Sequence, residues 1–259
     1  MSASRPIDAA FFDDLFGAYE RSPAIRALMR SALDERLPVE VEPYSFVTMN
    51  ALEAIAQQLR LSTDALLVDL ACGRGGPGMW ITRATGARLI GVDFSAVAVT
   101  QARARIAAFR LQDRAEFRIG ELHATGLTDA QADALLCVDS VQFAGDPRLV
   151  AQEAARVLRP GGSLVFTGWE PRETGDHRLP ECFVNLDFGG LLRTAGFDEV
   201  AVTHRPDLQR RQQAVFRRAL ATDPGRDRAM TQLRAEAVRM LPLMPLLRRV
   251  HITAVRARR

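Results

Sequence analysis

The sequence predicts an α/β fold, in which a mostly parallel sheet is flanked by helices and preceded by a helical segment. Three observations support this prediction. Short apolar runs alternate with helical patterns from residue 62 onward, a glycine-rich turn follows the first of these runs, and residues 1–60 carry helical patterns only. With 259 residues and 47% hydrophobic composition, the chain is large enough for one elaborated domain with a sizeable core.

The first sixty residues are expected to form a helical cap. Ser22 and Pro23 are typical of the start of a helix, which we expect to run to about residue 36. A loop, "LPVEVEPYSF", follows. A second helical pattern over 47–59 places its apolar residues on one side, namely Met49, Leu52, Ile55, Ala56 and Leu59.

Residues 61–205 are expected to form the core of the sheet. Six apolar runs lie in this region, and a seventh, "RVHITAVRA", lies at the end of the chain; the six are "ALLVDL", "ARLIGVD", "AEFRIG", "DALLCVDS", "GSLVFTGW" and "EVAVTHR". Ser95 is placed to cap the helix after the second run, and Asp146 with Pro147 to start the helix after the fourth. "RPGG", residues 159–162, is predicted to be a turn between helix and strand.

An insert separates the sixth and seventh runs. Residues 206–246 contain two helical patterns split by "TDPG", which is too long for a simple connection. The insert is either a lid over a substrate or plain packing, since stripes of Met and Leu serve both. Residues 247–259 then hold the last strand and a tail.

The turn "VDLACGRGGPG", residues 68–78, is the first candidate site. Gly73, Gly75 and Gly78 match GxGxxG, which lets the backbone approach a ligand closely. Both a dinucleotide and S-adenosylmethionine are compatible with such a turn, and both use an acid after the second strand, here Asp93, to hold a ribose. A carboxylate at Asp69 would repel a pyrophosphate but attract a sulfonium cation, which favours S-adenosylmethionine.

At these residues the sequence resembles the class I S-adenosylmethionine-dependent methyltransferases. "VDLACGRGG" is similar to their first motif, "GVDFS" to the second and "GELHATGL" to the third, while "VDSVQF" and "EAARVLRPGGSLVF" are similar to later segments. The resemblance covers about residues 60–204 and "VHITAVRA". It implies a Rossmann-like seven-stranded sheet with an antiparallel last strand, and S-adenosylmethionine as cofactor with S-adenosylhomocysteine as product.

The resemblance also implies the residues that hold the cofactor. They lie in the matched motifs and in the first helix, whose aromatic residue closes over the cofactor: Tyr19, Asp69, Ala71, Gly73, Gly75, Asp93, Phe94, Glu121, Leu122, Asp139 and Ser140. Glu121 and Leu122 would contact the adenine through a side chain and a backbone N–H. Tyr44 and Phe46 are further aromatic candidates, because ring faces attract a sulfonium.

The catalytic candidates are few, since methyl transfer depends mainly on alignment and needs a base only when the acceptor must lose a proton. Many relatives that methylate hydroxyl groups have a histidine just after the fourth strand, where this chain has Gln142. Glu170 and His177 lie in the predicted loop "GWEPRETGDHRLPECF" and are the candidate bases, with Trp169 as a platform for a substrate ring.

Composition limits the partners and the location. The net charge is +3 and the basic residues, all arginine, are mostly scattered among acids, so we expect no nucleic acid partner. Three widely spaced cysteines, no signal-like amino terminus and no long apolar stretch predict a cytoplasmic protein without a metal or membrane site. We expect a small organic acceptor, O-methylation before N- or C-methylation, and bacterial natural product biosynthesis. Use of the cofactor for a cyclisation or as a structural ligand stays open, as does a homodimer.

Overall fold

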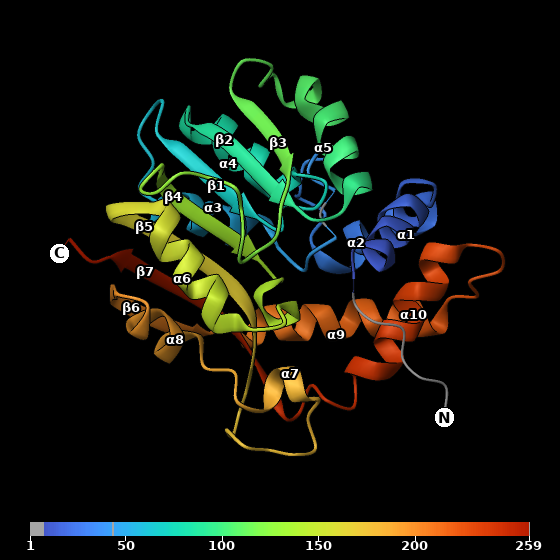
Figure 1. The fold of residues 1–259 in the computed structure, drawn as a ribbon. Helices are drawn as coiled ribbons and strands as arrows, with labels where there is room; N and C mark the ends of the chain where they lie inside the picture. Colours follow the sequence, from blue (N-terminus) through green and yellow to red (C-terminus); the bar gives the residue numbers. More distant parts are fainter. Residues whose placement is uncertain (1–7, 43, 259) are drawn as a thin grey trace.

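A computed structural model describes residues 8–42 and 44–258 of the chain. A seven-stranded sheet lies at its centre (Figure 1). The strands are β1 (Leu66–Leu70), β2 (Arg88–Asp93), β3 (Ala115–Ile119), β4 (Ala132–Val138), β5 (Leu158–Pro171), β6 (Phe197–His204) and β7 (Leu247–Arg256).

The order of the strands is β3-β2-β1-β4-β5-β7-β6. Neighbours among β1 to β5 pair in parallel, whereas β7 is antiparallel to both β5 and β6. This confirms the predicted fold class, a Rossmann-like seven-stranded sheet whose last strand is antiparallel. The chain crosses over between β3 and β4, so the carboxyl ends of β1 and β4 flank the point at which ligands bind in such sheets.

Helices cover both faces of the sheet, which is why β1 is buried along its whole length. On one face α3 (Met49–Gln58), α4 (Gly76–Thr85) and α5 (Ala96–Phe109) pack side by side, and α6 (Pro147–Val157) and α8 (Phe188–Thr194) pack on the other (Figure 1). Ser95 and Asp146 accept hydrogen bonds from backbone N–H groups at the starts of α5 and α6, as their sequence positions predict.

Four further helices gather beside the carboxyl ends of the strands. They are α1 (Ala9–Glu20) and α2 (Pro23–Leu33) from the amino-terminal region, and α9 (Pro206–Ala221) and α10 (Arg228–Met240) from the insert. α2 packs on α9, and α10 packs on both α1 and α9 (Figure 1). The cap and the insert therefore form one helical layer, although they are far apart in the sequence. The boundaries that we assign to the cap, core and insert stay predictions.

Strand β5 corrects two expectations. It begins directly after α6 and includes the "RPGG" segment, which we had predicted to be a turn; the irregular pairing of β4 with β5 and a φ of +78° at Gly161 accommodate it there. It also extends to Pro171, so Trp169 and Glu170 lie in a strand and not in a loop. The cause is pairing with β7, which runs from Ser163 to Pro171 without a break.

The described ranges contain neither a membrane-spanning helix nor a metal-binding cluster. None of the helices in residues 8–42 and 44–258 is both long and apolar enough to pass through a bilayer. Within the same ranges, no three His, Cys, Asp or Glu side chains are grouped as they would need to be to hold a metal ion.

Candidate functional site

The glycine-rich loop joins β1 to α4 and is built on left-handed backbone. Ala71, Gly73 and Gly75 have φ values of +50°, +52° and +73°. Such values favour glycine, and Ala71 adopts one of them without being glycine. Gly75 is also the cap residue of α4, and no side chain caps that helix. Loop and helix start therefore present backbone groups, which is the arrangement that lets a ligand approach closely.

Asp69 is the last but one residue of β1 and is 2% exposed. Burial, together with the charge of nearby Asp93, raises the pKa of its carboxyl to about 8, although the backbone N–H of Gly78 opposes this by donating to it. Desolvation therefore favours the protonated acid in the free protein. A bound cation would reverse the balance and favour the carboxylate.

Asp93 ends β2 and lies directly beside the loop. Its Oδ2 accepts a hydrogen bond from Gly73 N at 2.8 Å, and its Oδ1 accepts one from Ser95 N at 2.9 Å. Burial raises its pKa to about 6, and the charges of Asp13 and Glu121 raise it further. Glu121 is exposed and Leu122 half-buried, just after β3. The second and third motifs thus meet the first at one edge of the sheet.

Aromatic side chains of α1 cover this edge. A Cβ on Gly73 would lie 3.2 Å from Cζ of Phe16, so the Phe16 ring lies directly over the loop. Phe12 continues the layer, since its ring centroid is 5.4 Å from that of Phe94. Tyr19, our sequence candidate, is buried one turn further along α1 and contacts Arg74 and Tyr44. Sequence reasoning missed Phe16; its spacing of three residues from Tyr19 on one helix face was the available signal.

Residues after β4 close the other side of the site. Asp139 has a φ of +60° and is held by Arg249 at 2.5 Å, by the backbone N–H of Phe46 at 3.1 Å and by the hydroxyl of Thr167 at 2.7 Å. Ser140 is half-buried and donates to the carbonyl of Val138. Asp139 therefore ties the strand end to the cap loop and to β7.

Arg249 is a second residue beside the site that sequence reasoning missed. It is 1% exposed and donates to Oε1 of Gln212 on α9 at 2.9 Å as well as to Asp139. The rings of Trp169 and Phe46 lie 5.5 Å and 5.9 Å from its guanidinium carbon. Trp169 is 3% exposed and packs against this cation, so at least part of its ring is used within the protein, and its role as a platform for a substrate stays a prediction. An arginine among apolar residues in a strand was the only sequence signal.

The three catalytic candidates lie in different surroundings. Glu170 is 1% exposed, and its oxygens already accept hydrogen bonds from Phe188 N and Arg248 Nη2, each at 2.8 Å, so its role as a base stays a prediction. Gln142 is buried and donates its amide to the Asp139 carbonyl at 2.6 Å. His177 is exposed in the segment between β5 and α7 (Glu181–Val184). Among the described residues, no hydrogen bond or ion pair joins these three side chains to one another.

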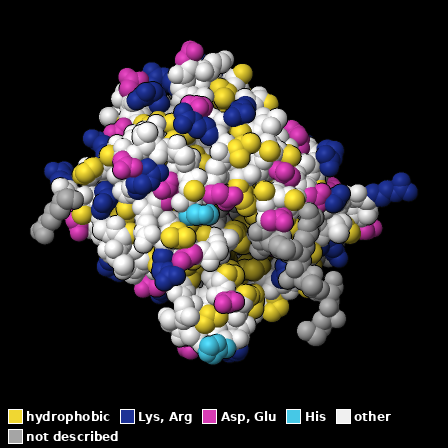
Figure 2. Space-filling view, viewed as in Figure 1, with side chains coloured by type: hydrophobic (Ala, Val, Ile, Leu, Met, Phe, Trp, Pro, Cys, Tyr) yellow, Lys and Arg dark blue, Asp and Glu magenta, His cyan; other side chains and the backbone are white. Residues whose placement is uncertain are grey.

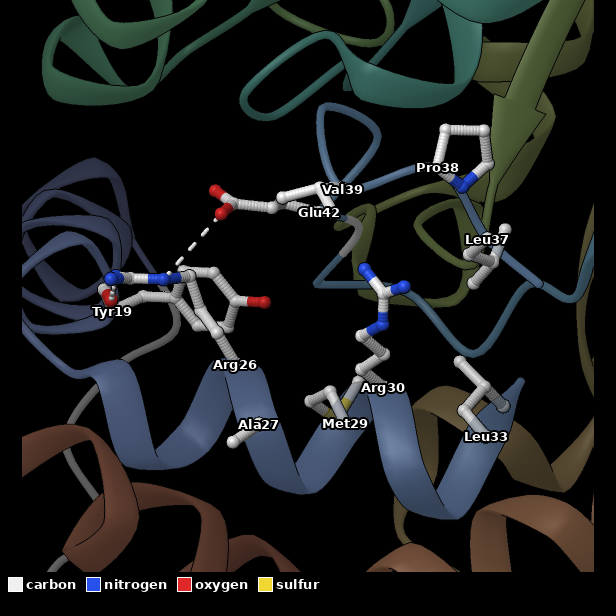
Figure 3. Close-up of a pocket in the computed structure, with 10 residues that line it drawn as sticks. All are labelled: Tyr19, Arg26, Ala27, Met29, Arg30, Leu33, Leu37, Pro38, Val39 and Glu42. Atoms are coloured by element: carbon white, nitrogen blue, oxygen red, sulfur yellow. Dashed lines mark hydrogen bonds and ion pairs between the residues drawn. The ribbon is translucent and has the colours of Figure 1, made fainter. Parts of the chain in front are cut away.

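A cavity of about 190 Å³ lies within the cap, between α2 and residues 37–42 (Figure 3). Its walls come from the cap alone and include Tyr19, Arg26, Arg30 and Glu42, and the Tyr19 hydroxyl and the Glu42 carboxylate point into it (Figure 3). Glu42 also pairs with Arg74 at 3.1 Å. The cavity thus adjoins the glycine-rich loop from outside, and its floor is not the carboxyl ends of the strands.

The residues present fit S-adenosylmethionine. A Cβ on Gly75 would lie 2.6 Å from the Phe117 ring, and one on Gly78 would lie 2.4 Å from Asp69. Neither position has room for a side chain, so the backbone of the loop packs closely against its neighbours. The acids Asp69 and Asp93 and the ring of Phe16 favour a ligand that carries positive charge. A diphosphate would meet the carboxyls of Asp69 and Asp93.

The fold and this site are similar to those of the class I Rossmann-like, S-adenosylmethionine-dependent methyltransferases. Residues 68–166 match the family model described as a methyltransferase domain. The family's cofactor is S-adenosylmethionine, as the sequence resemblance implied.

Relatives and solved structures agree with this assignment. The chain is similar to Methyltransferase GfsG of Streptomyces halstedii (30% identity over 64% of each chain) and to the 27-O-demethylrifamycin SV methyltransferase of Amycolatopsis mediterranei (30% identity over 46% of this chain and 44% of the relative). The chain thus spans less than two thirds of the length of these relatives. The crystal structure of the [4+2]-cyclase SpnF has the same fold, with a TM-score of 0.71 and 21% identity over 80% of this chain and 81% of that one.

Proposed function

We propose that the protein transfers a methyl group from S-adenosylmethionine to a small organic acceptor, with a hydroxyl oxygen as the first choice of acceptor atom. The observation that carries the proposal is the convergence of Asp69, Asp93 and the Phe16 ring on the glycine-rich loop. When bound, S-adenosylmethionine would supply a methyl group already activated by the positive sulfur. The chain's own residues then have to orient the acceptor and exclude water.

The helical layer supports a small acceptor. α1 and α10 pack together beside the strand ends, and Figure 2 shows hydrophobic and acidic side chains around a hollow on this face of the molecule. A mostly apolar, partly enclosed site suits a drug-sized molecule better than a protein or a nucleic acid. We propose that α9 and α10 are the lid that completes the enclosure.

One relative supports the choice of oxygen, and two support the pathway. The name of the Amycolatopsis mediterranei relative refers to a 27-O-demethylrifamycin, and the other relative comes from Streptomyces halstedii. We therefore propose a role in bacterial natural product biosynthesis, in the cytoplasm. Free thiols at Cys72, Cys137 and Cys182 are consistent with a reducing compartment.

The test is to incubate the purified protein with S-adenosylmethionine labelled in the methyl group and with panels of hydroxylated, amino and carbon acceptors. Product and S-adenosylhomocysteine are measured by mass spectrometry, with the Asp93→Asn variant as the inactive control. We expect label in one acceptor and one equivalent of S-adenosylhomocysteine. Labelled nitrogen or carbon would correct the acceptor atom, and no label with any acceptor would overturn the proposal.

The SpnF likeness makes one alternative specific. That protein is named as a [4+2]-cyclase although it has the methyltransferase fold. A cyclised product formed without S-adenosylhomocysteine in the same experiment would favour a cyclisation over methyl transfer.

A further inference from the structure

Glu236 is a carboxylic acid in the proposed lid, which consists of α9 and α10. It lies on α10, is half-buried, and its Oε2 accepts a hydrogen bond from the hydroxyl of Tyr44 at 3.4 Å. Among the described residues, Tyr44 is the one hydrogen-bond partner recorded for this carboxylate. It therefore retains acceptor capacity, unlike a structural carboxylate that is saturated by N–H donors.

A chain of contacts connects Glu236 to the cofactor loop. The Tyr44 ring meets the Phe16 ring edge to face, with 6.1 Å between centroids, and the Phe16 ring lies over Gly73. On the other side, Glu236 feels the negative charge of Asp139 at the end of β4. Glu236 thus lies between the first motif and the fourth-strand segment, the two elements that flank the ligand-binding edge.

Three other carboxyls near this edge are already committed. Asp139 is paired with the buried Arg249 and also accepts from Phe46 N, and both oxygens of Glu170 are bonded to Arg248 and Phe188. Asp93 is held by two backbone N–H groups. Glu236, with a single hydrogen bond of 3.4 Å, keeps more acceptor capacity than any of these three.

The titration of Glu236 suits this task. Burial raises its pKa to about 7, Asp139 raises it further, and Arg239 on the same helix and the Tyr44 hydroxyl lower it. A base with a pKa near the working pH combines a useful ionised fraction with useful basicity.

We propose that Glu236, oriented by Tyr44, accepts the proton that the acceptor loses on methylation. As the oxygen–carbon bond forms, the carbon–sulfur bond breaks with its electron pair on sulfur, the O–H pair stays on oxygen, and the proton moves to the ionised Glu236. This inference rests on the proposed function, since it needs an acceptor that loses a proton.

The experiment compares the wild type with Glu236→Gln, Glu236→Asp and Tyr44→Phe, with Glu53→Gln on the exposed side of α3 as the matched control. Formation of S-adenosylhomocysteine is followed between pH 5.5 and 9 with the acceptor found in the labelling experiment. Binding of S-adenosylmethionine is measured separately by calorimetry.

We expect the wild-type kcat to rise with pH through one ionisation near 7. Glu236→Gln should lower kcat by about 100-fold or more and abolish that ionisation, with the affinity for S-adenosylmethionine unchanged. Tyr44→Phe should move the midpoint upward, because the carboxylate loses a donor, and Glu236→Asp should keep a pH-dependent rate. The Glu53→Gln control should match the wild type.

The possible failures are distinct. An active wild type with a Glu236→Gln variant of equal kcat and equal pH profile would overturn the role of Glu236 and leave the proposed function intact. A wild type that yields no S-adenosylhomocysteine with any acceptor would overturn the proposed function, and this inference with it. If the Glu236→Gln protein does not fold, the Glu236→Asp variant provides the test. A rate that does not depend on pH in Glu236→Asp would overturn the proposal.

Discussion

Gly78 lies directly against the carboxyl group of Asp69, so that a Cβ at this glycine would be 2.4 Å from Oδ2. The backbone N–H of Gly78 also donates to that carboxyl. The third glycine of the GxGxxG pattern therefore serves the acid at the strand end in two ways, by leaving room for it and by binding it. The two features that the sequence showed separately are one structural unit.

Gly78→Ala should damage this unit. The added methyl group overlaps a buried carboxyl that has no room to move, and we expect a loss of about 1–3 kcal/mol in the free energy of unfolding. The affinity for S-adenosylmethionine should fall as well. Urea denaturation and calorimetry measure the two effects. Gly145→Ala is the matched control, because no atom lies within 4 Å of a Cβ there, and it should resemble the wild type. If the two variants were equally stable, the close contact between Gly78 and Asp69 would be contradicted.

Binding of S-adenosylmethionine should depend on pH through Asp69. In the free protein the pKa of this carboxyl is about 8, so below that pH it is mostly protonated. A bound cation lowers the pKa, and binding therefore releases a proton. The affinity should increase as the pH rises from 6.5 to 8, by at most about tenfold per pH unit, and level off above 8.

Calorimetry over this range, with Asp69→Asn beside the wild type, measures the effect. Titration of the ligand itself is common to both proteins, so the difference between them reports on Asp69. We expect the variant to bind more weakly at pH 8 and to lack the extra slope. Parallel affinity profiles for the two proteins would show that Asp69 is not linked to binding.

Phe16 should contribute to cofactor affinity through its ring. Phe16→Leu keeps an apolar side chain over Gly73 but removes the aromatic face, and we expect a loss of about 0.5–2 kcal/mol in binding free energy for the sulfonium. Phe11→Leu, on the same helix but only partly buried, should have little effect. S-adenosylhomocysteine lacks the positive charge on sulfur. If the Phe16→Leu variant loses as much affinity for it as for S-adenosylmethionine, the Phe16 ring contributes by packing alone.

Arg249 should contribute strongly to the free energy of unfolding, because it joins the sheet to the insert. Arg249→Met leaves Asp139 without its buried cation, and we expect a loss of about 3–5 kcal/mol in the free energy of unfolding. The exposed Arg178, which pairs with Asp176 at 2.7 Å, provides the control. Arg178→Met should cost at most about 1 kcal/mol. Similar losses for the two variants would mean that the Arg249 pair contributes no more than a surface pair.

The sequence alone predicted the sheet and its helices because periodicity and turn chemistry are local properties. Runs such as "ALLVDL" are apolar except for Asp69, as expected for strands covered on both faces, and caps such as Ser95 mark helix starts without reference to the rest of the chain. The expectation for Glu170 was wrong because local signals end the strand at residue 169, whereas pairing with β7 extends it to Pro171.

The sequence therefore determined the fold class, the glycine-rich loop and the acids at the ends of β1 and β2, since each depends on residues close together in the chain. Only the tertiary structure decided which side chains from distant segments share an environment: Phe16 over Gly73, Arg249 between Asp139 and Gln212, and Glu236 against Tyr44. It also decided the burial of Asp69, which raises the pKa of its carboxyl, because the ionisation of a carboxyl group depends on how far the assembled core removes it from water.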